Sequence, residues 1–359
     1  MREILSQVTP IQPLVNPRGI LARSIIDALR THYELSNPEL FRVPAGQSTM
    51  NYMIKDLEAT YFAKCYLPGT DIVAESEAIY LTELADRHGI PVATVLLSKR
   101  GACITRHDDV IISVWSWVSG RTANGSLTTG QAIEAGCALG RMHRFLADHP
   151  ASRGRPSLKA WMNPDLKGLE HAIGNLTSSI QSLHERDEFD EVAIQTLNER
   201  LAQLRHIPDL LESLPELTCQ VLHGDYSTEN VIYQGDQISA VVDFCPPSPF
   251  LISFELGRIA FAPPTVMFSD NWISIGRELI ESYLRWNPSV SDADIQSCGR
   301  IAILKILRSL YGVENHYLSP GLIQKKLDES WVMRHCAAKR MLEHLEEIEE
   351  TLSTVVRRS

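Results

Sequence analysis

The residues best suited to catalysis lie in the segment His223-Gly-Asp-Tyr-Ser-Thr-Glu-Asn230 and in the pair Asp243-Phe244. Asp225 and Asn230 stand five positions apart, and Asp243 ends the next expected strand. Carboxylate and amide oxygens are hard ligands of the kind that Mg²⁺ prefers. Phosphoryl transfer needs a metal to neutralise phosphate charge and a carboxylate to orient the attacking hydroxyl. The residue types and their spacing therefore favour phosphoryl transfer, whereas His-Gly-Asp alone would be equally compatible with an ordinary turn.

The same segment resembles the catalytic core of the aminoglycoside phosphotransferase and choline kinase-like family. That core has a His-x-Asp-x-x-x-x-Asn loop and a second aspartate at the end of the following strand, and its spacing equals that of the kinase catalytic loop. The resemblance implies that Asp225 is the catalytic aspartate, that Asn230 and Asp243 bind Mg²⁺, and that the cofactors are ATP and Mg²⁺. It also implies that His223 braces the loop.

One departure from the family pattern lies beyond the second aspartate. The family usually has an Asp-Leu pair 12 residues beyond the second aspartate, whereas this chain has Glu255-Leu256 there. The spacing is kept but the acidic side chain is one methylene longer, so the role of Glu255 is left open.

A lysine inside an apolar strand is the second candidate feature. Lys64 lies in Thr60-Tyr-Phe-Ala-Lys-Cys-Tyr66, where an ammonium group is costly unless it is paired. A phosphate group and a glutamate on the following helix would pair it, as in kinases of this type. Helical spacing puts Glu77 on the apolar face and favours it over Glu75. The alternative is that Lys64 is a solvent-facing residue of an alternating strand.

Two weaker nucleotide-binding features are expected between the strands. The turn at residues 44–50 could place backbone amides near phosphate oxygens, with Gly46, Ser48 and Thr49 as contacts, although a plain hairpin turn explains it nearly as well. By the resemblance, the segment 112–118 is the hinge that contacts adenine, with Ser116 and Val118 as contacts.

Composition narrows the classes of function. The 359 residues are 44% hydrophobic and 22% charged, which is typical of a globular chain, and the formal net charge is -10. No basic footprint for nucleic acid or an anionic membrane is present. The seven cysteines are single and odd in number, and neither a signal peptide nor a membrane-spanning run is recognisable, so we expect a cytoplasmic protein.

Periodicity predicts an α+β, bilobal fold, and the resemblance implies that it is protein-kinase-like. Short β-type runs with one helix favour a small nucleotide-binding N-lobe at 36–118, after an N-terminal extension at 1–35 that contains a helix. Long amphipathic patterns around a hairpin at Gly235-Asp236 favour a larger C-lobe at 119–359, which would be catalytic and substrate-binding. We expect the last helix to span roughly Trp331 to Val356.

The predicted function is an ATP-dependent phosphotransferase with an alcohol acceptor. The acceptor would be a small molecule: an amine-bearing alcohol, an aminoglycoside or a related metabolite. Tyr311, Glu314 and Tyr317 are candidate substrate contacts, because an acid among aromatic rings suits a cation. The alternatives are a catalytically silent nucleotide-binding protein and a protein kinase, which the absence of Ala-Pro-Glu disfavours. Oligomeric state is not predicted.

Overall fold

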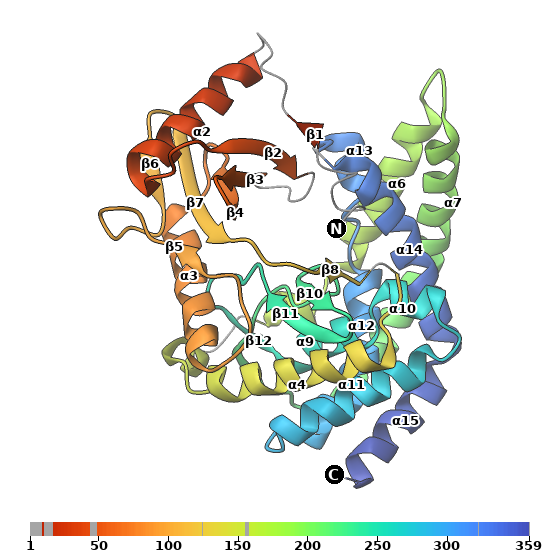
Figure 1. Cartoon of the computed structure of the whole chain (residues 1–359). Helices are drawn as coiled ribbons and strands as arrows, with labels where there is room; N and C mark the ends of the chain where they lie inside the picture. Colours follow the sequence, from red (N-terminus) through yellow and green to blue (C-terminus); the bar gives the residue numbers. More distant parts are fainter. Residues whose placement is uncertain are drawn as a thin grey trace. The chain divides into compact units, whose positions relative to one another are not determined.

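The computed structural model describes residues 9–10, 17–43, 49–123, 125–154, 158–321 and 323–358, and Figure 1 shows the course of the chain. The chain divides into two compact units. Unit 1 comprises Met1–Ser119, Ala240–Pro246 and Gly321–Ile323, and unit 2 comprises Gly120–Ser239, Pro247–Pro320 and Gln324–Ser359. Each unit has its own core and is described separately.

Unit 1 is built on an antiparallel sheet, to which the described residues contribute seven strands. Its order is β1 (Thr9–Pro10), β2 (Glu39–Val43), β3 (Thr49–Asp56), β4 (Ala59–Tyr66), β7 (Val110–Ser116) and β5 (Val95–Leu96), and β6 (Thr105–His107) also pairs with β7. Successive side chains of a strand point to opposite faces. On β4 this alternation places Ala63 and Cys65 on one face, and Phe62 and Lys64 on the other.

Two helices cover these two faces. Helix α2 (Pro17–Tyr33) packs Ile25, Ala28 and Leu29 into one core cluster with residues of β2, β3, β4 and β7. Helix α3 (Ile72–Arg87) lies on the opposite side, where Ile79 packs with Val95 and Trp115. The carboxylate of Asp71 caps α3 by accepting hydrogen bonds from two backbone amides of its first turn. The face that carries Lys64 is therefore the one that α3 covers.

Unit 2 is mainly helical and holds the expected hairpin. Strands β10 (Val231–Gln234) and β11 (Gln237–Val241) pair beside β8 (Arg121–Thr122), and β9 (Cys219–Val221) pairs with β12 (Pro249–Leu251). The helices are α4 (Thr129–Leu146), α5 (Lys159–Met162), α6 (Leu166–Gln181), α7 (Glu188–Gln203), α8 (Ile207–Glu212), α9 (Ile252–Ala260), α10 (Pro263–Phe268), α11 (Trp272–Trp286), α12 (Asp292–Leu307), α13 (Val313–Leu318), α14 (Gln324–Glu343) and α15 (Leu345–Arg358), with 3₁₀ turns at Pro150–Arg153 and Leu204–His206.

The last helix differs from the predicted one. It begins at Gln324 and is interrupted at His344, which gives α14 and α15 in place of one helix from Trp331 to Val356. The first turns of α14 bury only Leu327, so the apolar period gives no signal there.

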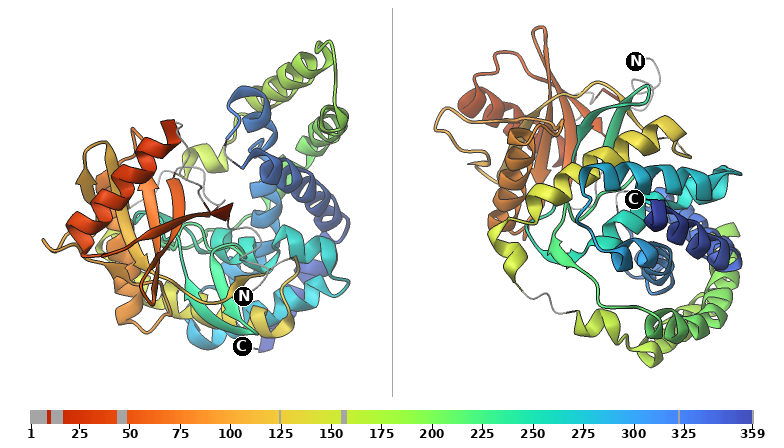
Figure 2. Two further views of the ribbon diagram at one scale, coloured as in Figure 1. Left: turned by 45° about the horizontal axis from the view of Figure 1, so that its top comes forward. Right: turned by 90° about the horizontal axis from the view of Figure 1, so that it is seen from below.

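Helices α4 and α11 lie side by side in unit 2 (Figures 1 and 2). Gly136 and Gly140 of α4 allow this contact, because a Cβ atom at either position would overlap backbone atoms of Leu279 or Tyr283. Close approach of this kind is a common reason for glycine within a helix.

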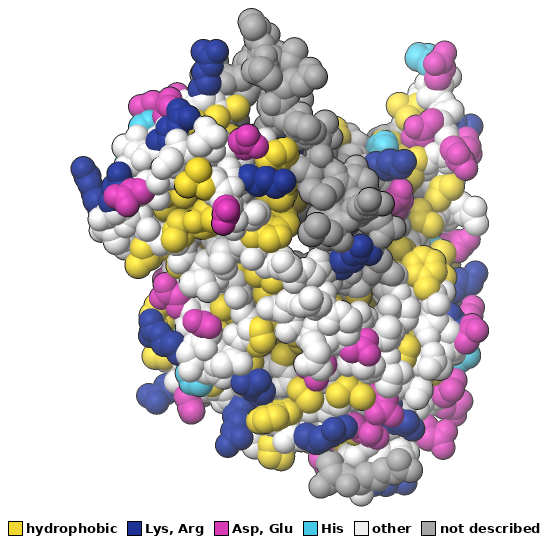
Figure 3. Space-filling view, viewed as in Figure 1, with side chains coloured by type: hydrophobic (Ala, Val, Ile, Leu, Met, Phe, Trp, Pro, Cys, Tyr) yellow, Lys and Arg dark blue, Asp and Glu magenta, His cyan; other side chains and the backbone are white. Residues whose placement is uncertain are grey.

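The described part of the face in Figure 3 shows no field of a single sign. On the described part of the face in Figure 3, basic and acidic side chains are interspersed. Within the described ranges, none of the helices combines the length and the apolar composition that a membrane crossing requires.

Replacing Gly136 by alanine should destabilise the protein by about 1–3 kcal/mol, because the new methyl group overpacks the contact between α4 and α11. Gly174 is the matched control, since it lies within α6 with no atom near its missing Cβ. Gly174→Ala should stabilise the protein by about 0.5–1 kcal/mol. Urea unfolding of both variants measures the difference, and equal effects would contradict the packing assignment.

Candidate active site

The loop after β9 carries the predicted catalytic aspartate. His223 is fully buried, and its Nδ1 accepts a hydrogen bond from the Asp225 amide at 3.2 Å. Gly224 adopts a φ of 91°, a left-handed conformation that favours glycine. The buried Tyr226 hydroxyl donates to the Ala135 carbonyl of α4 at 3.0 Å. The loop is thus tied down on both sides of Asp225, and His223 acts as a brace.

Asn230 holds the Asp225 carboxylate directly. Its Nδ2 donates to the backbone oxygen of Asp225 at 2.9 Å and to Oδ2 at 2.7 Å. An amide nitrogen has two hydrogens, so these bonds use both donors and leave Oδ1 as the atom for another partner. That oxygen has the hard-ligand character that Mg²⁺ requires, so Asn230 fits the predicted metal-binding role.

A buried carboxylate on α9 anchors the same loop. Glu255 is 2% exposed and accepts hydrogen bonds from the amides of His223 at 3.0 Å and Gly224 at 2.7 Å. Its Oε2 also lies 3.0 Å from Nε2 of His143, whose Nδ1 lies 3.0 Å from the Tyr283 hydroxyl. The glutamate that departs from the family pattern therefore satisfies two loop amides and a helix histidine at once.

The surroundings of Glu255 shift its ionisation. Burial alone would raise the pKa of the carboxyl, but the hydrogen bond and charge of His143, the charge of His223 and the Gly224 amide lower it overall. A lowered pKa in the folded state stabilises the protein above the pKa of the unfolded chain, and this stabilisation is lost as the pH falls through the lowered value.

Asp225 also has a cationic partner that the sequence did not indicate. Its Oδ1 forms an ion pair with the guanidinium of Arg258, three residues after Glu255 on α9. Residues three apart share a helix face, so α9 presents one side chain to the loop backbone and the other to the catalytic carboxylate. A search for charged positions on the face of Glu255 would have found Arg258.

In unit 1, Lys64 is paired with the second aspartate. Its ammonium forms an ion pair with Oδ1 of Asp243 and lies 5.8 Å from the centroid of the Trp115 ring. The Lys64 side chain is 21% exposed, so it is not a free solvent-facing residue. Asp243 has a φ of 62°, which is unusual outside glycine and is often found where a side chain must be aimed at a functional site.

The predicted helix partner of Lys64 was wrong by two positions. Glu77 is exposed, whereas Glu75 is half-buried and close to Lys64, Asp243 and Tyr66. Burial raises the pKa of the Glu75 carboxyl, and the positive charge of Lys64 opposes that shift. Val73, one turn before Glu77, lies in the first turn of α3 and is 71% exposed. The buried positions of α3 are Ala78, Ile79, Leu81, Thr82 and Ala85, and Glu75 lies one turn before Ala78 and Ile79.

The other predicted nucleotide contacts are Gly46, Ser48, Thr49, Ser116 and Val118, and the structure describes the last three of them. Gly46 and Ser48 lie outside the described residues. Thr49 is buried on β3 and donates to Oδ1 of Asn51 at 2.9 Å. The Ser116 amide and hydroxyl are both used by Thr94 on the neighbouring segment, at 2.8 Å each, and Val118 is half-buried after β7. Thr49 and Ser116 are therefore held within the sheet of unit 1.

The three predicted acceptor contacts do not form one group. Tyr311 is 42% exposed, and its ring and backbone carbonyl both face Arg334. Tyr317 instead donates to Asp190 of α7 at 2.7 Å, and Glu314 is exposed on α13. Tyr317 is thus anchored to α7, while Tyr311 belongs with Arg334.

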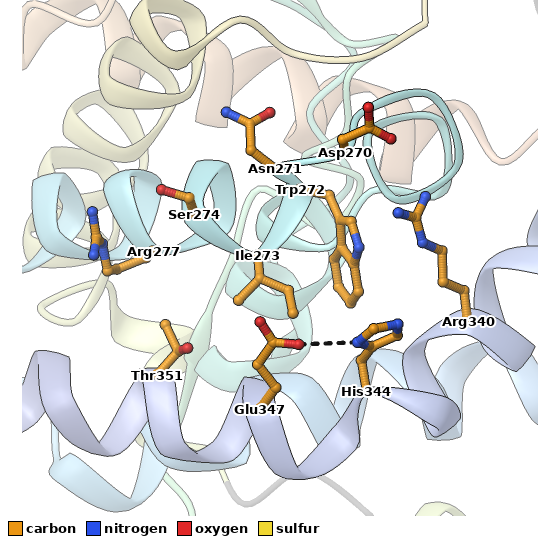
Figure 4. Close-up of a pocket in the computed structure, with 10 residues that line it drawn as sticks. All are labelled: Asp270, Asn271, Trp272, Ile273, Ser274, Arg277, Arg340, His344, Glu347 and Thr351. Atoms are coloured by element: carbon orange, nitrogen blue, oxygen red, sulfur yellow. Dashed lines mark hydrogen bonds and ion pairs between the residues drawn. The ribbon is translucent and has the colours of Figure 1, made fainter.

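A separate pocket of about 310 Å³ lies in unit 2 between α11 and the junction of α14 and α15 (Figure 4). Its basic groups already have partners: Arg340 donates to the Val266 carbonyl at 2.6 Å, His344 lies 2.9 Å from Glu347, and Arg277 pairs with Glu278. None of the predicted site residues lines it. This balanced pocket carries no evident chemistry.

Comparisons with known proteins place this geometry in context. Residues 39–287 match the model of the phosphotransferase enzyme family. A homoserine kinase of Parvibaculum lavamentivorans is 24% identical over 312 residues, which cover 84% of this chain and 89% of the relative.

Solved structures show the same fold. An AMP-bound spectinomycin phosphotransferase has a TM-score of 0.65 at 16% identity and covers 89% of this chain and 98% of its own. An amicoumacin kinase in complex with AMP-PNP, Ca²⁺ and Ami has a TM-score of 0.56 at 14% identity, with coverages of 90% and 96%. The predicted fold class, a β-rich N-terminal region and a helical C-terminal region of the kinase-like type, is confirmed.

Replacing Glu255 by glutamine should lower the free energy of unfolding at pH 7 by about 2–4 kcal/mol, because the amide group cannot accept from all the donors around it. Wild-type stability should fall as the pH drops below about 4.5, the ordinary value for glutamate, and this fall should be shallower in the variant. Urea unfolding at pH 7 and pH 4 tests both effects. Glu343→Gln, at an exposed position of α14, is the control, and equal stability of the two variants would contradict the anchoring role.

Proposed function

This chain belongs to the phosphotransferase enzyme family, and we propose that it transfers the γ-phosphate of ATP to a hydroxyl group of a small molecule. Its predicted likeness to aminoglycoside phosphotransferases and choline kinases is thereby confirmed. The observation that best supports the proposal is the pair of hydrogen bonds from Asn230 to Asp225. They hold in place the carboxylate that, in this proposal, accepts a hydrogen bond from the attacking hydroxyl.

Each proposed residue has a distinct part in the reaction. Asp225 orients the acceptor hydroxyl and takes its proton. Asn230 and Asp243 offer hard oxygens to Mg²⁺, which neutralises phosphate charge when bound. Lys64 binds phosphate oxygens, and Glu75 keeps its ammonium in place. His223 and Glu255 position the loop without touching the reacting atoms.

The protein-kinase alternative has little support. Only residues 244–251 separate Asp243 from the start of α9, and β12 occupies the last three of them. A peptide platform needs a long segment between its metal-binding aspartate and the next helix. The silent-scaffold alternative is also disfavoured, because Lys64, Asp225, Asn230 and Asp243 are all present.

The acceptor is proposed to be a metabolite-sized, amine-bearing alcohol. The curated relative is named a homoserine kinase, and homoserine has both an amine and a primary hydroxyl. Aminoglycosides and other amino alcohols belong to the same panel of candidates. Cytoplasmic localisation remains part of this proposal.

Asp225→Ala should reduce ADP release from ATP, Mg²⁺ and an acceptor alcohol by about a thousandfold, because the attacking hydroxyl loses its acceptor. A panel of homoserine, amino alcohols, aminoglycosides and sugars supplies the acceptors. Asp209→Ala, at an exposed carboxylate of α8 in the same unit, should keep full activity. Wild-type turnover in Asp225→Ala would remove the catalytic assignment, and ATP binding without turnover of any acceptor would favour the scaffold.

Glu75→Gln should raise the KM for ATP about tenfold, because the Lys64 ammonium loses a charged neighbour that positions it. Glu77→Gln removes the same charge two residues away at an exposed position and should leave the KM unchanged. Steady-state kinetics with varied ATP compare the two. A larger effect of Glu77→Gln would restore the partner predicted from the sequence.

A further inference from the structure

Three helices of unit 2 bring three cations together, and one of them pairs with Asp225. Arg258 of α9 forms the ion pair with its carboxylate, and the charges of Lys305 on α12 and Arg334 on α14 act on Arg258 and on each other. We call Arg258, Lys305 and Arg334 the cation cluster. Such a group of like charges is costly unless anions balance it.

The anions within reach do not balance the cation cluster. Asp225 forms an ion pair with Arg258, and Glu255 is hydrogen-bonded to His143 and to two backbone amides. Glu229 acts on Arg334 but pairs with Lys326 at 3.0 Å. Lys305 and Arg334 are therefore left without a carboxylate of their own among the residues that the structure describes.

Lys305 is the cation most affected by this lack of balancing anions. Its ammonium lies 5.5 Å from the centroid of the Phe254 ring, and within the described chain no oxygen accepts a hydrogen bond from it. The pKa of Lys305 is lowered to about 7, chiefly by burial and also by the charges of Arg258 and Arg334, while the charges of Asp225 and Glu255 act in the opposite direction. A charged residue in the apolar run Ile301–Leu307 was the sequence signal for this position.

Arg334 is anchored by neutral groups. It donates to the backbone oxygen of Tyr311 and, through Nε, to that of Ser330 at 3.2 Å, and it lies 5.6 Å from the centroid of the Tyr311 ring. These contacts orient the guanidinium without cancelling its charge. A guanidinium held in this way can bind a carboxylate through two parallel hydrogen bonds.

Aromatic rings adjoin the cation cluster. The Phe254 ring beneath Lys305 meets Phe250 edge-on at 4.9 Å between centroids, and Phe250 meets Trp161 in the same way at 6.1 Å. This wall would contact short methylene chains, but it offers no acid to a cationic substrate. The chemistry next to Asp225 is thus positive and apolar.

We propose that the cation cluster binds a carboxylate of the acceptor, so that the substrate is a small hydroxy amino acid whose hydroxyl reaches Asp225. This inference rests on the proposed function and narrows its acceptor. Lys305 and Arg334 are specificity-determining residues of that site. The γ-phosphate of ATP is the other anion that the cation cluster could bind, and the experiments below distinguish phosphate binding from carboxylate binding.

Matched acceptors provide the first test. L-Homoserine and 3-aminopropan-1-ol differ only in the carboxylate, as do L-serine and ethanolamine. In ADP-release assays the carboxylate member of each pair should have a kcat/KM at least about tenfold higher, since charge-assisted hydrogen bonds add to its binding. Preference for the amino alcohols would overturn the proposal.

Variants provide the second test. Lys305→Met should raise the KM of the carboxylate acceptor about tenfold, leave the KM of ATP unchanged and reduce the preference within each pair. Arg334→Gln should act in the same direction. Lys339→Met removes one exposed positive charge from α14 and should behave as wild type. A rise in the KM of ATP alone would assign the cation cluster to the nucleotide and overturn the proposal.

Calorimetry with a non-hydrolysable ATP analogue separates this inference from the proposed function. Binding of L-homoserine or L-serine to wild type and Lys339→Met, but not to Lys305→Met, supports the carboxylate site even without turnover. In that case the phosphotransferase assignment fails alone. Absence of carboxylate binding in all the proteins would overturn the inference whatever the kinetics show.

Discussion

The buried carboxylate of Glu255 is the contact on which the candidate active site depends. It accepts hydrogen bonds from two successive amides of the loop that carries Asp225, and it joins that loop to His143 of α4. A buried anion is stable only when its oxygens are fully hydrogen-bonded, so the loop and the charge support one another.

Helix α9 links the stability of unit 2 to its chemistry. The helix carries Glu255 toward the loop backbone and Arg258 toward the Asp225 carboxylate, and its Phe254 ring lies beneath Lys305. One short helix thus contacts the loop backbone, the Asp225 carboxylate and, through Phe254, the Lys305 ammonium. A chain with a net charge of -10 nevertheless brings three cations together at this place, so the local charge differs in sign from the overall composition.

Unit 1 shows which contacts local sequence patterns can predict and which they cannot. The apolar strand around Lys64 predicted that its ammonium needs a partner, because an unpaired ammonium is costly in apolar surroundings. Helical periodicity did not identify the right glutamate, since both glutamates lie close to buried positions of α3 and only Glu75 is itself half-buried. The pairing of Lys64 with Asp243 joins residues 179 positions apart, a separation over which local patterns carry no information.

The sequence by itself determined the kind of chemistry and the class of fold. Asp225 and Asn230 meet within one loop, their spacing is a local property, and periods of two and 3.6 residues distinguish strands from helices. Only the tertiary structure decided which distant charges surround Asp225. Arg258, Lys305 and Arg334 come from three separate helices, and their common position depends on how apolar faces pack. The same packing places Glu75, and not Glu77, near Lys64. Tertiary contacts set which face of a helix is buried, and the helical period of the sequence only approximates that face.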